Sequence, residues 1–265
     1  MTIPVVLTIS GHDPSGGAGI QADIEAIVAT GCRATSAITC LTIQDTANVG
    51  KVAATPPQLL DGQIRTLLAD MRIAAFKIGL IPDMAILAVI SEILLDHPTV
   101  PVVLDPVLAS GGGTELAGKQ LISGLLEHLL PRTTLITPNS VEARRLTGAQ
   151  LLDACGQDLL AHGCQAALIT GTHESDKEVI NRLYQAKSGV ITSRWARLQD
   201  SYHGSGCTLA SSVAGFIAKG FTLEAAVQQA LEYTWMSLSQ GERPGKGQML
   251  PDRLFAMRHS EVPTQ

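Results

Sequence analysis

The sequence predicts a single α/β domain built on a mostly parallel sheet, and three observations support this class. Short apolar runs of strand length alternate with segments of helical period along most of the 265 residues. Apolar residues make up 45% of the chain but aromatic residues only 3%, so Ala, Val, Ile and Leu must fill the core, which is typical of parallel strands covered by helices. No repeat, low-complexity tract or linker divides the sequence, so residues 1–265 are expected to form one domain.

Strand and helix candidates follow one another in a regular order. Short apolar runs bounded by turn or polar residues predict buried strands, at residues 5–10, 34–42, 74–78, 102–105, 135–137 and 166–170. The segments between them have helical period, at residues 19–30, 56–71, 83–96, 115–129, 140–146 and 150–162, with Gly31 and Gly163 placed to end two helices. This alternation predicts helices on both faces of the sheet and right-handed crossovers.

The last third of the chain departs from this alternation. Residues 179–184 and 189–194 are separated only by Gln-Ala-Lys-Ser, which suits an antiparallel hairpin at a sheet edge. Two long helices are expected next, at 205–219 and 223–240, with Thr222 as the cap of the second.

Composition excludes several classes of partner. The chain has 19 basic and 24 acidic residues, a net charge of -5 and no basic tract, so nucleic acid is not expected to bind. No segment approaches about 18 consecutive apolar residues, and the N-terminal apolar run lacks a basic flank and stops at Gly11. The five cysteines are odd in number and form no Cys-x-x-Cys pair, which argues against disulfides and zinc. A reduced, cytoplasmic protein without membrane contact is expected.

The stretch Asp200-Ser-Tyr-His-Gly-Ser-Gly-Cys-Thr-Leu-Ala-Ser211 is the most informative. Gly204 and Gly206 allow the backbone to approach a ligand, and the predicted helix would point free N–H groups and its positive dipole end at an anion. A thiol at such a position has its thiolate favoured, so Cys207 is a candidate base or nucleophile. From this motif alone, a buried structural cysteine at a helix start is an equally good interpretation.

Polar residues and glycines gather immediately after the predicted strands, where open α/β sheets bind ligands. They lie at residues 11–23, 44–46, 79–80, 105–107, 137–142 and 170–173. Asn139 and Glu142 have the spacing of a capping box. Glu142 and Asp105 are also candidates to hold Mg²⁺ through water, because this ion takes one or two carboxylates together with substrate phosphates.

Other motifs carry less chemistry. Gly17-Ala-Gly-Ile-Gln-Ala22 matches the dinucleotide fingerprint formally, but Gly17 lies seven residues beyond the strand end at Ser10, and no P-loop motif occurs. The loop histidines share no metal-ligand spacing and are expected to be solvated or bonded to backbone, namely His12, His173 and His203. Trp195, Trp235 and Tyr233 are expected to be packing residues.

Several motifs together resemble the hydroxymethylpyrimidine/phosphomethylpyrimidine kinases of the ribokinase-like superfamily, from Val5 to about Gln240. They are Gly11-His-Asp-Pro-Ser-Gly-Gly-Ala-Gly-Ile-Gln-Ala-Asp23, Thr42-Ile-Gln-Asp-Thr46, Lys77-Ile-Gly79, Asp105-Pro-Val107, Thr137-Pro-Asn-Ser-Val-Glu142 and His203-Gly-Ser-Gly-Cys-Thr208. The resemblance implies a three-layer α/β/α sandwich, often dimeric, that phosphorylates a thiamin precursor with ATP and Mg²⁺.

The resemblance also implies roles for individual residues. The pyrimidine-binding positions would be Gly11, Asp23, Gln44, Leu80 and Val107. The amides of Gly204, Gly206 and Cys207 would cradle the transferred phosphoryl group, with Cys207 as general base. The ATP-binding positions would be Asn139, Thr170 and Gly171, and Asp105 and Glu142 would hold Mg²⁺.

The chain departs from the common family pattern in three places. Leu80 stands where methionine is frequent, Ser110-Gly-Gly-Gly113 replaces a loop that often carries lysine, and Thr172 replaces a glycine. The first change conserves volume. The other two leave the phosphate-binding lysine unassigned, with Lys177 a candidate only by its place in the sequence.

Three alternatives stay open beside the pyrimidine kinase. A pyridoxal or pyridoxine kinase shares the superfamily and a hydroxymethyl acceptor, although Gln44 favours the pyrimidine because an amide can meet both a donor and an acceptor. A hydrolase would use Cys207 with His203, a pair separated awkwardly by a glycine turn. A non-catalytic pyrimidine or nucleotide sensor is the third.

Overall fold

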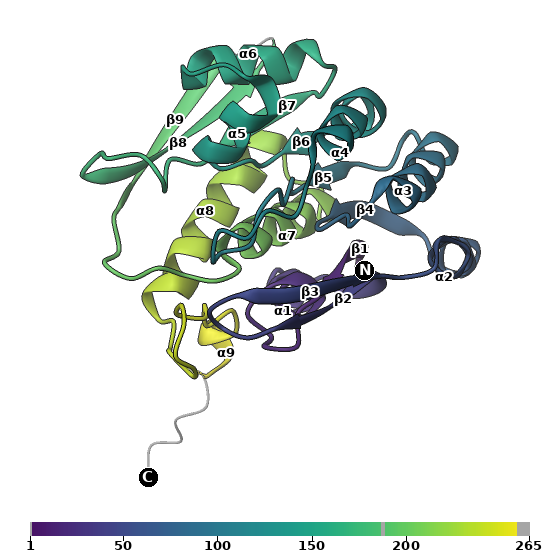
Figure 1. Cartoon of the computed structure of the whole chain (residues 1–265), viewed down its shortest axis with the longest axis horizontal. Helices are drawn as coiled ribbons and strands as arrows, with labels where there is room; N and C mark the ends of the chain where they lie inside the picture. The colour runs from purple at the N-terminus through teal and green to yellow at the C-terminus, as the bar shows by residue number, and fades with distance from the viewer. Residues whose placement is uncertain (1, 187–188, 259–265) are drawn as a thin grey trace.

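A nine-stranded sheet runs through the computed structural model, which describes residues 2–186 and 189–258 (Figure 1). The strands are β1 Val5–His12, β2 Arg33–Gln44, β3 Val49–Ala54, β4 Ile73–Ile78, β5 Val102–Leu104, β6 Leu135–Ile136, β7 Ala166–Ile169, β8 Glu178–Gln185 and β9 Gly189–Ala196. Their order across the sheet is β3-β2-β1-β4-β5-β6-β7-β8-β9. The six strands from β2 to β7 in this order are parallel, and antiparallel strands lie at both edges.

The sheet confirms the predicted parallel strands and the antiparallel hairpin β8–β9. Lys187 and Ser188 of its predicted turn lie outside the described residues, as do residues 259–265 of the predicted domain. Strand β3 was not predicted, because Val-Gly-Lys-Val-Ala-Ala forms neither a clean alternation nor a continuous apolar run. It pairs antiparallel with β2 and brings Val49 opposite Gln44.

The helices also follow the prediction closely. They are α1 Gly19–Ala29, α2 Pro57–Asp70, α3 Met84–Asp96, α4 Lys119–Gly124, α5 Ser140–Thr147, α6 Leu152–Ala161, α7 Ser205–Ala218, α8 Leu223–Ser239 and α9 Phe255–Arg258. The helix predicted at 115–129 begins only at Lys119, because the preceding residues form a turn in which Leu116 N–H donates to Leu108 O. Its last part is the π-helical turn Leu125–Leu129.

Helices cover both faces of the sheet, so the parallel strands are buried on both sides (Figure 1). Leu7 of β1 packs into the core under α2 to α6, and its neighbour Val6 packs into the core under α1, α7 and α8; both are fully buried. This three-layer α/β/α arrangement explains why the strands are apolar runs and do not alternate.

Helix α7 is the element that positions the site. It packs against β1, β4 and β5, and residues 207–215 are all buried. The helix begins beside the carboxyl ends of the strands, where Gly204 has a φ of 77°. That left-handed conformation lets the chain turn sharply into the helix.

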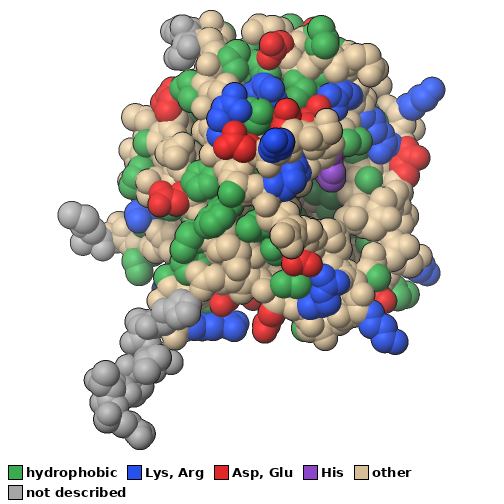
Figure 2. All heavy atoms as spheres, turned by 90° about the vertical axis from the view of Figure 1, so that its left-hand side faces the viewer, with side chains coloured by type: hydrophobic (Ala, Val, Ile, Leu, Met, Phe, Trp, Pro, Cys, Tyr) green, Lys and Arg blue, Asp and Glu red, His purple; other side chains and the backbone are tan. Residues whose placement is uncertain are grey.

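On the face seen in Figure 2, basic and acidic side chains are interspersed, with apolar side chains scattered among them. Among the described residues, no helix combines the length and the apolar character that crossing a bilayer requires.

Helix α3 offers a matched test of the core. Leu94 is 1% exposed, whereas Leu95 on the same helix is 54% exposed. Leu94→Ala should lower the free energy of unfolding by about 2–5 kcal/mol, because it loses buried area and leaves a cavity. Leu95→Ala should change it by no more than about 0.5 kcal/mol. Urea unfolding measures both free energies. Equal losses for the two variants would show that Leu94 is not the residue of this pair that α3 packs into the core.

Candidate active site

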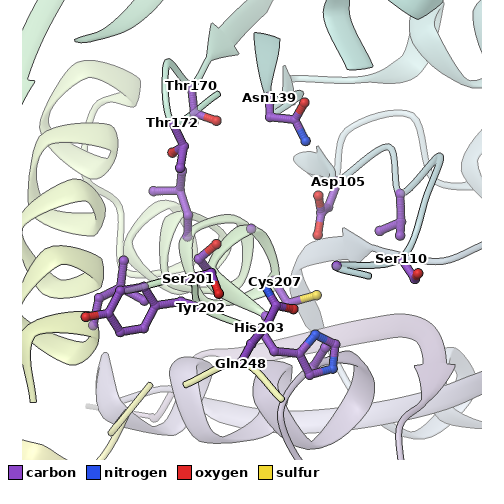
Figure 3. A pocket seen from close by; sticks show the side chains of 18 of the residues that line it. Asp105, Ser110, Asn139, Thr170, Thr172, Ser201, Tyr202, His203, Cys207 and Gln248 are labelled. Carbon is purple, nitrogen blue, oxygen red and sulfur yellow. The ribbon is translucent and has the colours of Figure 1, made fainter. Parts of the chain in front are cut away.

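A pocket of about 770 Å³ opens at the carboxyl ends of the parallel strands, beside the start of α7. Figure 3 shows Asp105, Asn139, Thr170 and Cys207 around it, contributed by segments far apart in the sequence. Most residues predicted for the site line this pocket: Gly11, Gln44, Leu80, Asp105, Val107, Asn139, Glu142, Thr170, Gly204, Gly206 and Cys207. The pocket therefore lies where the rule for open α/β sheets predicts a ligand site.

Asp23 is a correction to the predicted acceptor site, because it does not line the pocket. It is fully buried in α1, and its carboxylate is already engaged. Thr8 Oγ1 donates to Oδ2 at 2.6 Å, and Ser211 Oγ donates to Oδ1 at 2.7 Å. Lys77 Nζ lies 2.8 Å from Oδ1. The carboxylate of Asp23 is thus directed at groups of the protein beneath the pocket.

Gly171 is a second correction, since it lies behind the pocket wall. A Cβ at this position would come within 2.3 Å of Ile180 O, and Gly171 N–H donates to Asn181 Oδ1 at 3.2 Å. The glycine is needed for the close approach of β7 and β8, and Thr170 beside it faces the pocket.

Lys77 lies fully buried beneath the pocket, between two carboxylates. Its Nζ is 2.8 Å from Asp23 and 3.9 Å from Asp105 Oδ2. Burial acts to lower the pKa of Lys77, but the attraction of the carboxylates of Asp23 and Asp105 outweighs it and raises that pKa. A permanent positive charge therefore lies under the start of α7.

Cys207 is buried, and burial opposes the thiolate that its place at a helix start predicts. Burial raises the pKa of its thiol to about 12, and the negative charges of Asp105 and Asp23 act in the same direction. Lys77 and the backbone N–H of Gly19 oppose this shift without reversing it. Desolvation thus dominates over the helix dipole, because the thiol lies inside the protein and not at a solvated helix end.

The capping box at α5 is confirmed. Asn139 Oδ1 accepts from Val141 N–H at 3.0 Å and Glu142 N–H at 2.9 Å, while Glu142 Oε2 accepts from Asn139 N–H at 3.0 Å. Burial and the nearby charge of Asp105 raise the pKa of Glu142 to about 8.

The carboxyl groups of Asp105 and Glu142 fit a divalent cation. Burial also raises the pKa of Asp105, and its Oδ2 accepts no hydrogen bond from the described residues. A cation would supply the missing partner and relieve the repulsion between the two carboxylates. The residues that the structure describes contain no cluster of three or more His, Cys, Asp or Glu able to hold a metal by themselves. Phosphates and water would have to complete the coordination shell.

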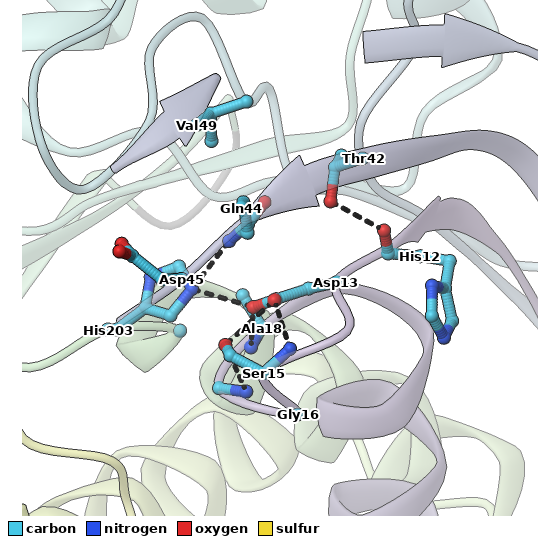
Figure 4. A network of polar contacts seen from close by, with 12 residues as sticks. His12, Asp13, Ser15, Gly16, Ala18, Thr42, Gln44, Asp45, Val49 and His203 are labelled. Atoms are coloured by element: carbon cyan, nitrogen blue, oxygen red, sulfur yellow. Dashed lines mark hydrogen bonds and ion pairs between the residues drawn. The ribbon is translucent and has the colours of Figure 1, made fainter. Parts of the chain in front are cut away.

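The sequence did not predict a buried polar network beside the part of the pocket that Gln44 and His203 line, which is called the acceptor end below (Figure 4). His203 Nε2 lies 2.7 Å from Asp13 Oδ2 and 3.0 Å from Gln44 Nε2. His203 was expected to be solvated or bonded to backbone, yet its side chain is buried and bonded to a carboxylate. The signal was present in Asp-Pro-Ser-Gly, since Asp before such a turn commonly binds backbone N–H groups two or more residues on.

Arg253 was also missed, because no motif surrounds it. It is buried, and its Nε donates to Thr208 Oγ1 at 2.8 Å in the first turn of α7. Its other nitrogens donate to Gly16 O, Gly17 O and Glu25 Oε2. The guanidinium therefore ties the glycine-rich loop before α1 to the start of α7.

The two tryptophans behave as predicted and also line the pocket. The rings of Trp195 and Trp235 are stacked with their centroids 6.2 Å apart, and Trp235 Nε1 donates to Ala196 O at 3.0 Å. Together with Leu238 they contribute apolar surface to the pocket wall.

The fold and the pocket define a class: they are those of the ribokinase-like kinases, which phosphorylate small molecules. Residues 13–252 match the model of the phosphomethylpyrimidine kinase family. The chain belongs to that family.

Individual relatives agree with this assignment. A hydroxymethylpyrimidine/phosphomethylpyrimidine kinase from Synechococcus elongatus is 35% identical over 254 residues, which cover 94% of this chain and 96% of that protein. The structure of a phosphomethylpyrimidine kinase from Clostridium difficile has a TM-score of 0.77 at 30% identity, covering 88% of this chain and 98% of that one. The ADP complex of a Bacillus subtilis pyridoxal kinase has a TM-score of 0.88 at 25% identity, covering 97% of this chain and 100% of that one.

Proposed function

We propose that this protein transfers the γ-phosphoryl group of ATP to 4-amino-5-hydroxymethyl-2-methylpyrimidine and then to the resulting monophosphate, in thiamin biosynthesis. One observation supports the proposal: Gln44, Leu80 and Val107 line the same pocket as the glycine-rich start of α7. Positioning and charge stabilisation supply most of the catalysis in such transfers.

The acceptor end is shaped for a flat ring with polar edges. Gln44 offers a carboxamide, while Leu80 and Val107 offer apolar surface for the ring faces. A Cβ at Gly11 would come within 2.9 Å of Cys40 Sγ and 3.1 Å of Leu80 Cδ2. A side chain at Gly11 would therefore displace Cys40 or Leu80, and Leu80 lines the pocket.

The donor end would hold ATP. The free amides at the start of α7, from Gly204 to Cys207, suit the transferred phosphoryl group. Asn139 and Thr170 line the pocket toward the stacked tryptophans and would contact the rest of the nucleotide. Asp105 and Glu142 would hold Mg²⁺, which neutralises phosphate charge when bound.

Cys207 is the proposed base for the hydroxymethyl group. Its thiol must first release its proton to water in the pocket, and Lys77 and the N–H of Gly19 are the groups placed to stabilise the resulting thiolate. The hydrolase alternative is not supported, because His203 Nε2 is engaged by Asp13 and Gln44.

Pyridoxal or pyridoxine phosphorylation is the second candidate, since the Bacillus subtilis pyridoxal kinase has the same fold over almost the whole chain. Membership in a kinase family speaks against a non-catalytic sensor.

We further propose a cytoplasmic homodimer, in which the exposed Leu41 and Ile43 of β2 offer apolar surface for contact between subunits.

A turnover assay tests this proposal directly. The purified protein with ATP and Mg²⁺ should convert the hydroxymethylpyrimidine to its monophosphate and then to its diphosphate, with products identified by mass. Under the same conditions kcat/KM for pyridoxal should be lower, because Gln44 is placed for a ring with more polar edges. Faster turnover of pyridoxal would make the second candidate the correct one, and no turnover of either would refute both.

The two transfers should depend differently on Cys207. An alcohol must lose a proton near the transition state, whereas a phosphate monoester with a second pKa near 6 is already largely ionised. Cys207→Ala should therefore lower kcat for the alcohol by about 10²- to 10⁴-fold and for the monophosphate by much less. Rates on both acceptors, with Cys155→Ala as a control at a buried cysteine outside the pocket, decide this. Equal losses would mean that Cys207 shapes the cradle and is not a base.

A further inference from the structure

Three polar side chains from distant parts of the chain meet at the acceptor end (Figure 4). Asp13 follows β1, Gln44 ends β2, and His203 immediately precedes Gly204 of the anion cradle. Asp13 is 3% and His203 9% exposed, so both groups must be satisfied within the protein.

The carboxylate of Asp13 has all its accepting positions occupied. Its Oδ1 accepts from the N–H of Ser15 at 2.8 Å and from the Ser15 hydroxyl at 2.7 Å. Its Oδ2 accepts from Ala18 N–H at 2.9 Å and faces His203 Nε2 at 2.7 Å. Burial acts to raise the pKa of Asp13, but these hydrogen bonds outweigh it and lower that pKa.

An ionised Asp13 fixes the proton of the imidazole. A carboxylate can only accept, so His203 Nε2 must carry a hydrogen and donate it to Oδ2. The ring itself is confined: a Cβ at Gly17 would lie 2.3 Å from His203 Cδ2, and a Cβ at Gly111 would lie 3.3 Å from its Nδ1. His203 is thus held between two glycines with its donor in a fixed direction.

The fixed donor determines how Gln44 is turned. As placed, Gln44 Nε2 lies 3.0 Å from His203 Nε2, whose one hydrogen is directed at Asp13 Oδ2. Two N–H groups this close repel each other, whereas Gln44 Oε1 in that place could share the hydrogen with Oδ2. Because the nitrogen and oxygen of a carboxamide exchange places on a half turn, the network assigns Oε1 to the side of His203. The NH₂ group of Gln44 is then directed into the pocket that this residue lines.

We propose that Asp13 and His203 are positioning residues that hold the NH₂ group of Gln44 toward the acceptor, so that the site selects a ring with an unprotonated nitrogen at that edge. This inference rests on the proposed function for the identity of the acceptor. The same pair links ring recognition to phosphoryl transfer, because His203 adjoins Gly204 and Asp13 binds the N–H of Ala18 at the start of α1.

Acceptor discrimination tests the proposal. The substrates are the hydroxymethylpyrimidine and its two analogues in which one ring nitrogen is replaced by CH. The wild-type protein should reject one analogue by at least about 10²-fold in kcat/KM, because a donor would be left unpaired. His203→Leu should remove most of that discrimination, whereas His203→Gln, which can still donate near the position of Nε2, should restore part of it.

Two comparisons separate positioning from a general structural effect. In the Gln44→Leu background, His203→Leu should cause no further loss of discrimination. His162→Leu, at an exposed histidine on the far end of α6, should behave as wild type. A loss for His203→Leu that is equal on all three acceptors would overturn the proposal.

A second measurement needs no turnover. Nitrogen NMR of labelled histidine in the free protein should show the His203 imidazole with its proton on Nε2, identified by comparison with His203→Gln. A proton on Nδ1 with a bare Nε2 would overturn the inference whatever the substrate is. Absence of turnover by the wild-type protein would refute the proposed function instead, and the tautomer alone would then decide the inference.

Discussion

The arrangement of this protein depends on the buried ion pair between Lys77 and Asp23. Removing an ammonium group from water costs several kcal/mol unless a partner compensates it, and Lys77 is fully buried. Asp23 supplies that partner at 2.8 Å and is itself held by hydroxyl groups of Thr8 and Ser211. One carboxylate therefore joins β1, α1, β4 and α7, and fixes where α7 begins relative to the strand ends.

This pair also governs the charges above it. Asp105 lies 3.9 Å from Lys77 on the pocket side, and Cys207 lies within reach of both. Burial disfavours the thiolate of Cys207, while the positive charge of Lys77 beneath it is the feature that could stabilise a thiolate during the reaction. Asp105 and Glu142 disfavour each other's ionisation, which makes this edge of the pocket receptive to a cation. The glycine loop and the start of α7 are then tied together by Arg253.

Much of the fold, and the position of most predicted site residues around one pocket, could be predicted from the sequence, because both depend on local patterns. Buried parallel strands are apolar runs, and the polar residues after them, such as Gln44 and Asp105, must share one edge of the sheet. Asp23 and Gly171 were misplaced because a motif does not tell whether a side chain faces the ligand or the core. The contact of His203 with Asp13 and that of Arg253 with Thr208 were not predicted, since each joins residues more than 40 positions apart in sequence and only packing brings them together. The pKa of Cys207 was misjudged because burial cannot be read from a glycine-rich helix start.

The most direct measurement is a double-mutant cycle on the buried pair, with free energies of unfolding for Lys77→Met, Asp23→Asn and the double variant. Each single change should cost about 3–5 kcal/mol, because it leaves an uncompensated buried charge. The double variant should lose less than the sum of the two by at least about 1 kcal/mol, since neither charge then remains. If the loss in the double variant equalled the sum of the two single losses to within about 0.5 kcal/mol, the two residues would contribute independently, and the ion pair would not have the central role given to it here.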